Sequence, residues 1–213
     1  VAAALICGAW PALAFDLYMI RHAETLGNAT GDYSGDRGDT LTEKGRRQCD
    51  EAVLKLQPYT FDIIYVSPSE RTKNTITPYL RSHGRTARIL PQIVECCWEE
   101  GRNPGMLRQC NLRRDEEIVL TPEQAQLFTM VPGERTYSNN GDFVNGMCQV
   151  DEAYDFLMRR FSGTNTRVLL VTHGQLSHYL IGKFLGREFE RYLHNIELII
   201  LKQREDGSFA LDR

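Results

Sequence analysis

The sequence predicts one α/β domain of three layers, with helices on both faces of a mostly parallel β-sheet. Short apolar runs rich in β-branched and aromatic residues alternate with segments whose apolar residues recur at helical spacing. The chain has 213 residues, of which 42% are hydrophobic and 25% are charged, the balance of an ordinary folded domain. That composition excludes collagen, coiled coil and bulk disorder.

Short apolar segments bounded by polar or turn residues predict the strands of this sheet. They are Leu17–Arg21, Ile63–Ser67, Ala87–Leu90, Arg167–Thr172 and Ile196–Lys202, with Ser208–Leu211 as an edge strand. The long stretches between them leave room for the crossover helices that parallel neighbours require.

Apolar residues at positions i, i+3, i+4 and i+7 predict the helices. The first expected helix begins after Thr42, which caps it, and has its apolar residues between Cys49 and Leu56. The others are Glu70–Leu80, Thr121–Met130, Phe143–Phe161 and Leu176–Leu185. Pro78 is expected to bend the second of these helices, and Gly186 to end the last.

Residues 91–141 interrupt this alternation and contain four prolines. A connection of this length inside a compact domain is often a cover over the functional site. It can equally be a surface insertion that the fold tolerates. Both interpretations stay open at this point.

Val1–Ala14 carries no charge and ends in small residues, which is typical of the later part of a secretory signal peptide. The alternatives are a structural segment or a retained anchor, although the run is too short to span a bilayer, which takes about 20 residues. We expect a mature domain of residues 15–213 in the periplasm or secreted, without a stable membrane anchor; the alternative is a cytoplasmic protein.

The formal net charge is −3 and the isoelectric point is near 6.0, so no global positive field recruits nucleic acid. An anionic small molecule would have to be held by a local cluster of arginines. The composition predicts no oligomeric state.

Five cysteines follow the amino-terminal run, and none forms a Cys-x-x-Cys pair of the kind found in structural zinc sites. Cys49 and Cys148 fall on apolar helix faces and are expected to be small core residues. If a disulfide forms, we expect it between Cys110 and either Cys96 or Cys97.

Unusual polar residues follow three of the predicted strands. They are Arg21-His22, Ser67 with Arg71 four residues on, and His173-Gly174. Ligands of open parallel sheets bind beyond the carboxyl ends of the strands. Two histidines and two arginines are therefore expected on one rim.

This combination suits phosphoryl transfer. A neutral imidazole can attack phosphorus without first losing a proton, and arginine offers two hydrogen bonds to phosphate while staying charged. A second, protonated histidine can bind another oxygen, and an acid must protonate the leaving alkoxide. Positive side chains take the role of a metal in such a site, so we expect no metal or cofactor.

Four sequence blocks, in order across residues 17–186, resemble the signature blocks of the histidine phosphatase superfamily, in its phosphoglycerate mutase-like branch (branch 1). The blocks are Arg21-His22-Ala23-Glu24-Thr25 with Asn28, Leu41–Gly45 with Gln48, Ser67–Thr75, and Val171–Gly174. The resemblance implies the phosphoglycerate mutase-like fold and a phosphohistidine mechanism.

The resemblance also implies residue roles. His22 would be the phosphorylated nucleophile. The phosphoryl group would be bound by Arg21, Asn28, Arg71, His173 and Gly174. Gly174 follows the second histidine, where the phytase-like branch has Asp, and this favours the mutase-like branch.

Two features depart from the family pattern. Ala23 stands where most members have Gly. Trp98–Gly101 resembles the end of the run that usually follows the general acid, so Glu95 is the expected acid and Glu99 is its rival.

The remaining histidines have structural interpretations. His83 and His178 are expected at the surface and in helix packing. His194-Asn195 precedes the strand Ile196–Lys202 and could approach the site, but a turn is the favoured interpretation. Thr75 is expected to pack within its helix rather than to bind phosphate.

The sequence thus predicts a phosphoric monoester hydrolase of the histidine acid-type that acts on small phosphomonoesters. One alternative is a phosphoglycerate-type phosphomutase, which shields its phosphoenzyme from water. The other is a phosphoanion-binding module without catalysis.

Overall fold

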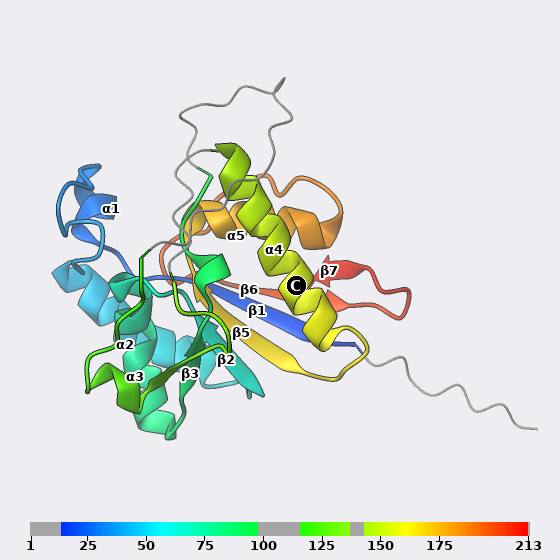
Figure 1. The fold of residues 1–213 in the computed structure, drawn as a ribbon, viewed down its shortest axis with the longest axis horizontal. Helices are drawn as coiled ribbons and strands as arrows, with labels where there is room; N and C mark the ends of the chain where they lie inside the picture. Colours follow the sequence, from blue (N-terminus) through cyan, green and yellow to red (C-terminus); the bar gives the residue numbers. More distant parts are fainter. Residues whose placement is uncertain (1–13, 98–115, 137–142, 213) are drawn as a thin grey trace, which may run out of the picture.

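A computed structural model describes residues 14–97, 116–136 and 143–212. Their centre is a seven-stranded sheet in the order β4-β3-β2-β5-β1-β6-β7 (Figure 1). The strands are β1 (Asp16–Arg21), β2 (Ile63–Val66), β3 (Ala87–Ile89), β4 (Phe128–Met130), β5 (Arg167–Thr172), β6 (Leu198–Gln203) and β7 (Phe209–Leu211). β1 to β5 pair in parallel, whereas β6 and β7 are antiparallel, so the sheet is mostly parallel, as expected.

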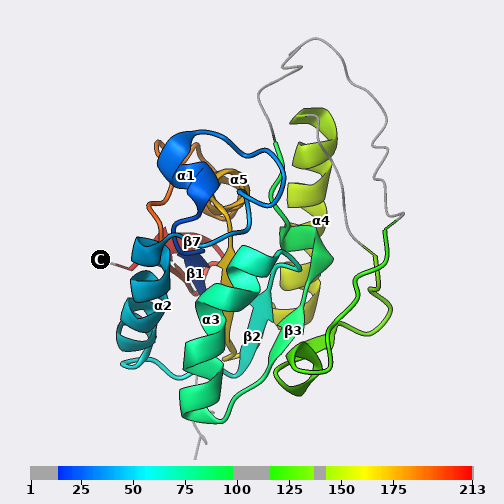
Figure 2. The ribbon, with the colours of Figure 1, turned by 90° about the vertical axis from the view of Figure 1, so that its left-hand side faces the viewer.

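Helices cover both faces of the sheet (Figures 1 and 2). The helices are α1 (Leu26–Thr30), α2 (Glu43–Leu56), α3 (Glu70–His83), α4 (Phe143–Phe161) and α5 (Gly174–Leu185), with 3₁₀ turns η1 (Pro91–Ile93) and η2 (Gln124–Gln126). α2 and α3 pack on one face, and α4 and α5 pack on the other. The predicted three-layer α/β/α architecture is confirmed.

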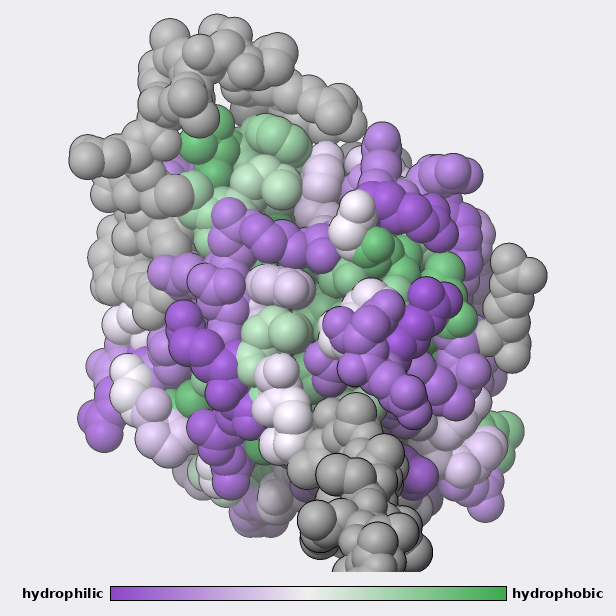
Figure 3. Space-filling view, turned by 90° about the vertical axis from the view of Figure 1, so that its right-hand side faces the viewer, coloured by the Kyte–Doolittle hydropathy of each residue, from purple (hydrophilic) through white to green (hydrophobic). Residues whose placement is uncertain are grey.

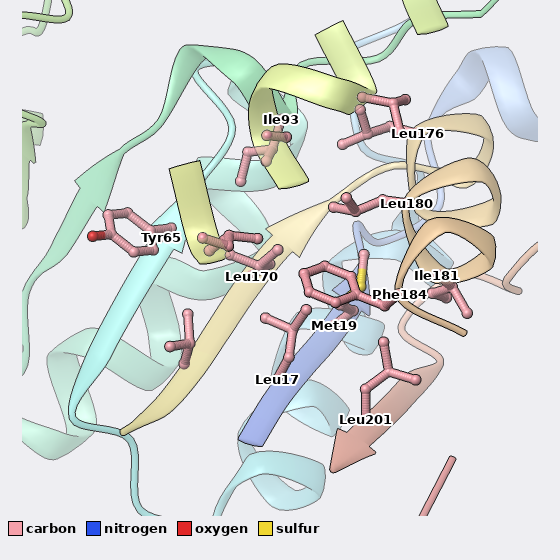
Figure 4. Packing of buried hydrophobic residues seen from close by; sticks show 14 of the residues in the cluster. Leu17, Met19, Tyr65, Ile93, Leu170, Leu176, Leu180, Ile181, Phe184 and Leu201 are labelled. Carbon is pink, nitrogen blue, oxygen red and sulfur yellow. The ribbon is translucent and has the colours of Figure 1, made fainter. Parts of the chain in front are cut away.

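The alternation of side chains along β1 builds two cores. Leu17 and Met19 point toward α5 and join its Leu180 and Phe184 (Figure 4). Tyr18 and Ile20 point the other way and join the residues of α2 and α3. Because both faces of the strand are buried, its sequence is an unbroken apolar run instead of an alternating one.

The register of the three central strands brings their carboxyl ends to one level. Arg21 pairs with Thr172, and Val66 pairs with Val171. The residues that follow these strands, among them His22 and His173, therefore leave the sheet at the same edge.

The predicted elements fall close to the observed ones, with one clear error. The segment Thr121–Met130 was expected to be a helix, but it contains only η2 before Phe128–Met130 pairs with β3 as an edge strand. Pairing with the edge of β3 satisfies the backbone of these three residues, and this interaction overrides their weak helical pattern. α1 was also not predicted, since it is only five residues long.

The connection over residues 91–141 contributes β4 to the sheet. Its residues 98–115 and 137–141 lie outside the described part, so its role as a cover stays a prediction.

Residues 1–13 of the expected signal segment also lie outside the described part of the chain. Within the described ranges no helix is long and apolar enough to cross a bilayer. The face in Figure 3 shows hydrophilic residues around smaller hydrophobic areas.

Two cysteine predictions are wrong. Cys96 and Cys97 are free thiols buried in the core, so neither pairs with Cys110, which lies outside the described residues. Cys148 is half-buried and disulfide-bonded rather than a small core residue. Cys49 is free and buried, as expected.

The start of α2 braces the loop that follows β1. Thr42 caps the helix through a hydrogen bond from the Gly45 amide, and a Cβ atom at Gly45 would lie 2.0 Å from the Glu24 carbonyl oxygen. The Glu24 amide donates to Gln48 Oε1 at 2.7 Å. The block from Leu41 to Gln48 therefore serves as a structural support for the segment that carries His22.

We expect Gly45→Ala to lower the free energy of unfolding by about 2 kcal/mol, because a backbone carbonyl occupies the place of the new methyl group. Urea denaturation measures the effect. Gly38→Ala is the control, since its Cβ would meet its nearest atom at 3.9 Å. Equal stabilities of the two variants would contradict the packing described.

Candidate active site

A pocket of about 540 Å³ lies at the carboxyl edge of the central strands. Its described lining comprises Arg21, His22, Asn28, Tyr33, Gly38, Arg71, Glu95, Gly174, Gln175 and Tyr192. Of the site residues expected from the sequence, this list includes all except His173, which lies directly behind His22, and Glu99, which lies outside the described residues.

His22 presents one defined ring nitrogen to this pocket. Its backbone amide donates to the Thr172 carbonyl, and its Nδ1 lies 2.7 Å from the Ala23 carbonyl oxygen. A carbonyl can only accept, so Nδ1 carries the proton and Nε2 keeps its lone pair. Burial, and then the positive charge of Arg71, hold the pKa of His22 well below its ordinary value of 6.5. The imidazole is therefore neutral at neutral pH.

His173 is fully buried behind His22, and the two ring centroids are 5.3 Å apart. Its Nδ1 accepts a hydrogen bond from Arg71 Nε at 3.2 Å, and its Nε2 lies 2.7 Å from Ser67 Oγ. Nε2 thus carries the single N–H of the ring and donates a hydrogen bond to Ser67 Oγ. Burial and the charge of Arg71 lower the pKa of His173 well below 6.5. The expectation of a protonated second histidine is wrong for this arrangement. Nδ1 of His173 accepts a hydrogen bond from the guanidinium of Arg71, so this nitrogen cannot also carry a proton.

Arg71 is held by an acidic residue that the sequence reasoning missed. Its Nη1 lies 2.9 Å from Asp39 Oδ1, and the same oxygen accepts from the Arg71 amide at 3.1 Å. Asp39 thereby caps the first turn of α3 and fixes the guanidinium. An anion was expected beside Arg71 at this helix start, and the carboxylate of Asp39 occupies part of that position.

Arg21 points into the pocket with one donor unused. Its Nη1 donates to the Leu193 carbonyl at 2.6 Å, whereas its buried Nε has no hydrogen-bond partner within the described ranges. The guanidinium packs against Gly174, where a Cβ would lie 3.3 Å from Arg21 Cζ. A side chain at this position would push the guanidinium away by a few tenths of an ångström.

Asn28 is fixed by the loop around it. It forms a capping box with Thr25 at the start of α1, and its Oδ1 also accepts from Asn195 Nδ2 at 3.2 Å. Asn195 in addition donates to the His22 carbonyl at 2.9 Å. Asn195 lies in a turn, as expected, and it also joins the His22 segment to the chain before β6.

The chain beside Asn195 adopts an unusual backbone conformation. Ile196 has φ of +52°, which is uncommon for a β-branched residue. Its amide donates to the Arg21 carbonyl at 3.0 Å, and its carbonyl accepts from Lys55 Nζ at 3.2 Å. These contacts hold a strained residue in place and orient Asn195 toward His22.

Ala23 causes no such strain. Its φ is not positive, and its amide donates to Thr75 Oγ1 at 2.9 Å. The replacement of the family's usual glycine is therefore compatible with the local backbone. Thr75 has the structural role expected for it.

Glu95 reaches the pocket from the segment that follows η1. Its Oε1 accepts from the Leu176 amide at 3.0 Å, in the first turn of α5. Burial raises the pKa of Glu95 above its ordinary value of 4.5, although this amide and the charges of Arg71 and Arg21 oppose the shift. A carboxyl in this position can hold a proton and release it.

A second cavity, of about 630 Å³, lies between α2, α3 and the loop before α2. It has no histidine in its described lining, and Asp36, Asp39, Asp50 and Glu70 give it an excess of negative charge. A phosphate would be repelled there. No cluster of three or more His, Cys, Asp or Glu side chains suited to a metal occurs among the residues that the structure describes.

His22, two arginines and a carboxyl thus line one pocket, with His173 next to His22, and the family comparison agrees with this geometry. The model of the histidine phosphatase superfamily (branch 1) matches residues 17–212. The chain belongs to this superfamily. The match spans nearly all of the described residues and includes the four sequence blocks.

Relatives within the superfamily carry different names. The chain is 35% identical over 170 residues to the adenosylcobalamin/alpha-ribazole phosphatase of Salmonella typhi, covering 80% of this chain and 79% of that protein. It is 26% identical over 172 residues to the "Probable phosphoglycerate mutase GpmB" of Erwinia tasmaniensis, covering 80% and 74%. The alpha-ribazole phosphatase structure from Shigella flexneri superposes with a TM-score of 0.64 at 19% identity, covering 92% of this chain and 94% of that one.

We expect Ser67→Ala to lower the free energy of unfolding by about 1–3 kcal/mol, because the buried Nε2–H of His173 loses its acceptor. Ser177→Ala is the matched control. Ser177 is also fully buried, but its hydroxyl has no partner in the described structure, so its removal should cost little. Thermal or urea unfolding of both variants checks the difference, and an equal loss would refute the His173–Ser67 bond.

Proposed function

We propose that this protein hydrolyses small phosphomonoesters through a phosphohistidine formed on Nε2 of His22, as a phosphatase of the histidine acid-type. The observation that carries the proposal is the neutral, oriented imidazole of His22 in a pocket with two guanidinium groups, one of which keeps a buried, unpartnered donor. Oxygen atoms of a phosphoryl group supply the acceptors that Arg21 lacks.

In the first step, the Nε2 lone pair of His22 forms a bond to phosphorus while the bond to the ester oxygen breaks. Arg21 and Arg71 stabilise the charge on the phosphoryl oxygens, and Asn28 lines the same part of the pocket. His173 holds Arg71 through its Nδ1 and acts as a positioning residue in this arrangement. Glu95 gives its proton to the departing alkoxide.

In the second step, water attacks the phosphohistidine, and the Glu95 carboxylate accepts a proton from that water. The bond between nitrogen and phosphorus breaks, inorganic phosphate leaves, and the neutral imidazole is restored. Glu95 is again protonated, so the cycle is balanced. The charge stabilisation comes from arginine side chains, and the reaction as written needs no metal or cofactor.

A phosphomutase is the second candidate, because one relative is named as a phosphoglycerate mutase. The names of the Salmonella and Shigella relatives favour the phosphatase. Product analysis separates the two: a phosphatase releases inorganic phosphate, whereas a mutase returns the phosphoryl group to its substrate. The carboxyl of Glu95 in the pocket argues against a binding module without catalysis.

We further propose that the protein is exported to the periplasm or secreted. The uncharged Val1–Ala14 run supports this, as does the disulfide at Cys148, since disulfides persist in oxidising compartments. Amino-terminal sequencing of the protein made in cells tests it. Retention of Val1–Ala14 would favour the cytoplasmic alternative.

We expect His22→Ala to reduce the hydrolysis of glycerol phosphate by at least about a thousandfold with the fold intact. His83→Ala is the control, because His83 is exposed and stacks on Tyr79 outside the pocket. Release of inorganic phosphate and circular dichroism measure activity and folding. Activity above a few percent in the His22 variant would contradict the proposed nucleophile.

The pH profile should show both shifted groups. Activity should fall at low pH as His22 becomes protonated, at a pH below 6.5 because its pKa is lowered. It should fall again as pH rises through the elevated pKa of Glu95, since only the protonated carboxyl can donate.

We expect Glu95→Gln to remove the alkaline limb for glycerol phosphate and to lower kcat by about a hundredfold or more. Hydrolysis of p-nitrophenyl phosphate is the internal control, because its leaving group needs little protonation. Equal losses for both esters would exclude Glu95 as the acid.

A further inference from the structure

Two tyrosines at the pocket stand out by their exposure. Tyr33 is 60% exposed and Tyr192 is 44% exposed. The described part of the chain has two other large hydrophobic side chains exposed to a similar degree, Leu54 and Val119, and neither lines this pocket. Exposed aromatic surface that gathers at one pocket is typical of a binding site.

Tyr33 is held in a defined orientation. Its ring lies against the backbone of α1 at Gly27, where a Cβ would lie only 2.5 Å from Tyr33 Cδ1. Its hydroxyl accepts a hydrogen bond from Asn28 Nδ2 at 3.2 Å. The ring is thus connected to a residue that belongs to the phosphate end of the pocket.

Tyr192 is held in a similar way from the opposite end of the chain. Its ring centroid is 4.7 Å from that of His178 on α5. The carbonyl of the next residue, Leu193, accepts from Arg21, and His178 Nδ1 contacts the Arg191 carbonyl at 3.2 Å. Rings fixed before a ligand arrives lose little conformational entropy when they bind it.

The charges of the pocket indicate what the tyrosines contact. Among the described lining residues the cations are Arg21 and Arg71, and the proposed function uses both for the phosphoryl group. No further cation in that lining remains for a second anionic group on the substrate. The surface left for the alcohol portion is aromatic and neutral, which suits a planar ring.

We propose, resting on the proposed function, that the leaving alcohol of the substrate carries a planar aromatic ring, which Tyr33 and Tyr192 contact. This makes the two tyrosines specificity-determining residues. A pocket of about 540 Å³ has room for a phosphoryl group together with such a ring.

The test uses two ligands that share a ribose 5-methylenephosphonate, in which a methylene group replaces the ester oxygen. They differ in the group on C1, which is an adenine ring in one and a methoxy group in the other. They are the methylenephosphonate analogues of adenosine 5′-monophosphate and of methyl ribofuranoside 5-phosphate, which cannot be hydrolysed. We expect the wild-type protein to bind the adenine-bearing analogue about tenfold more tightly in calorimetry. Tyr33→Leu and Tyr192→Leu should each reduce this preference severalfold without weakening the methyl riboside analogue.

Leu54→Ala is the control, because Leu54 is exposed on α2 away from the pocket, and it should keep the wild-type preference. Equal binding of the two ligands to wild type would overturn the inference. So would a preference that survives both Leu substitutions, or a loss that affects the two ligands equally. Hydrolysis of methyl ribofuranoside 5-phosphate by wild type is measured separately. Its absence would count against the proposed phosphatase, whereas the binding preference is read without turnover.

Discussion

The register between β1, β5 and β2 determines where the chemistry of this protein occurs. Arg21 pairs with Thr172, and Val66 pairs with Val171, so the chain leaves three strands at one level. Residues more than a hundred positions apart in sequence thereby become neighbours, and the His22 and His173 rings lie 5.3 Å apart. A shift of one residue in this pairing would turn each side chain to the opposite face of the sheet and dismantle the pocket.

The electrostatics of the pocket follow from this close approach. Burial and the positive charge of Arg71 keep both imidazoles neutral, so the same guanidinium that can hold a phosphoryl oxygen also preserves the lone pair of His22. Glu95 experiences the opposite balance, in which burial outweighs the nearby cations and raises the pKa of its carboxyl. The same pocket therefore holds a neutral imidazole, whose Nε2 has a free lone pair, and a carboxyl group that keeps its proton more readily than in water.

The sequence predicted the parts of the molecule that local patterns determine. The apolar runs located most strands, and the polar residues after them predicted that Arg21, His22 and Arg71 share one pocket. Glu95, which lines the same pocket, was predicted from the family resemblance alone. The partners that fix these groups escaped prediction, because Asp39 and Asn195 lie in irregular segments with no periodic signal. β4 was mistaken for part of a helix because its three residues gain their structure from pairing with β3. Two of the cysteine predictions failed for a similar reason, since spacing along the chain does not reveal which thiols the core encloses.

The position of β1 has a consequence for how the protein is made. The first strand of the chain lies between β5 and β6, which begin only at Arg167 and Leu198 and are therefore synthesised much later. During translation β1 has no partner on either side, and the sheet closes only when the carboxyl-terminal part has emerged. Assembly therefore cannot proceed from one end to the other, and the nascent polypeptide must keep an apolar segment from aggregating until its neighbours arrive.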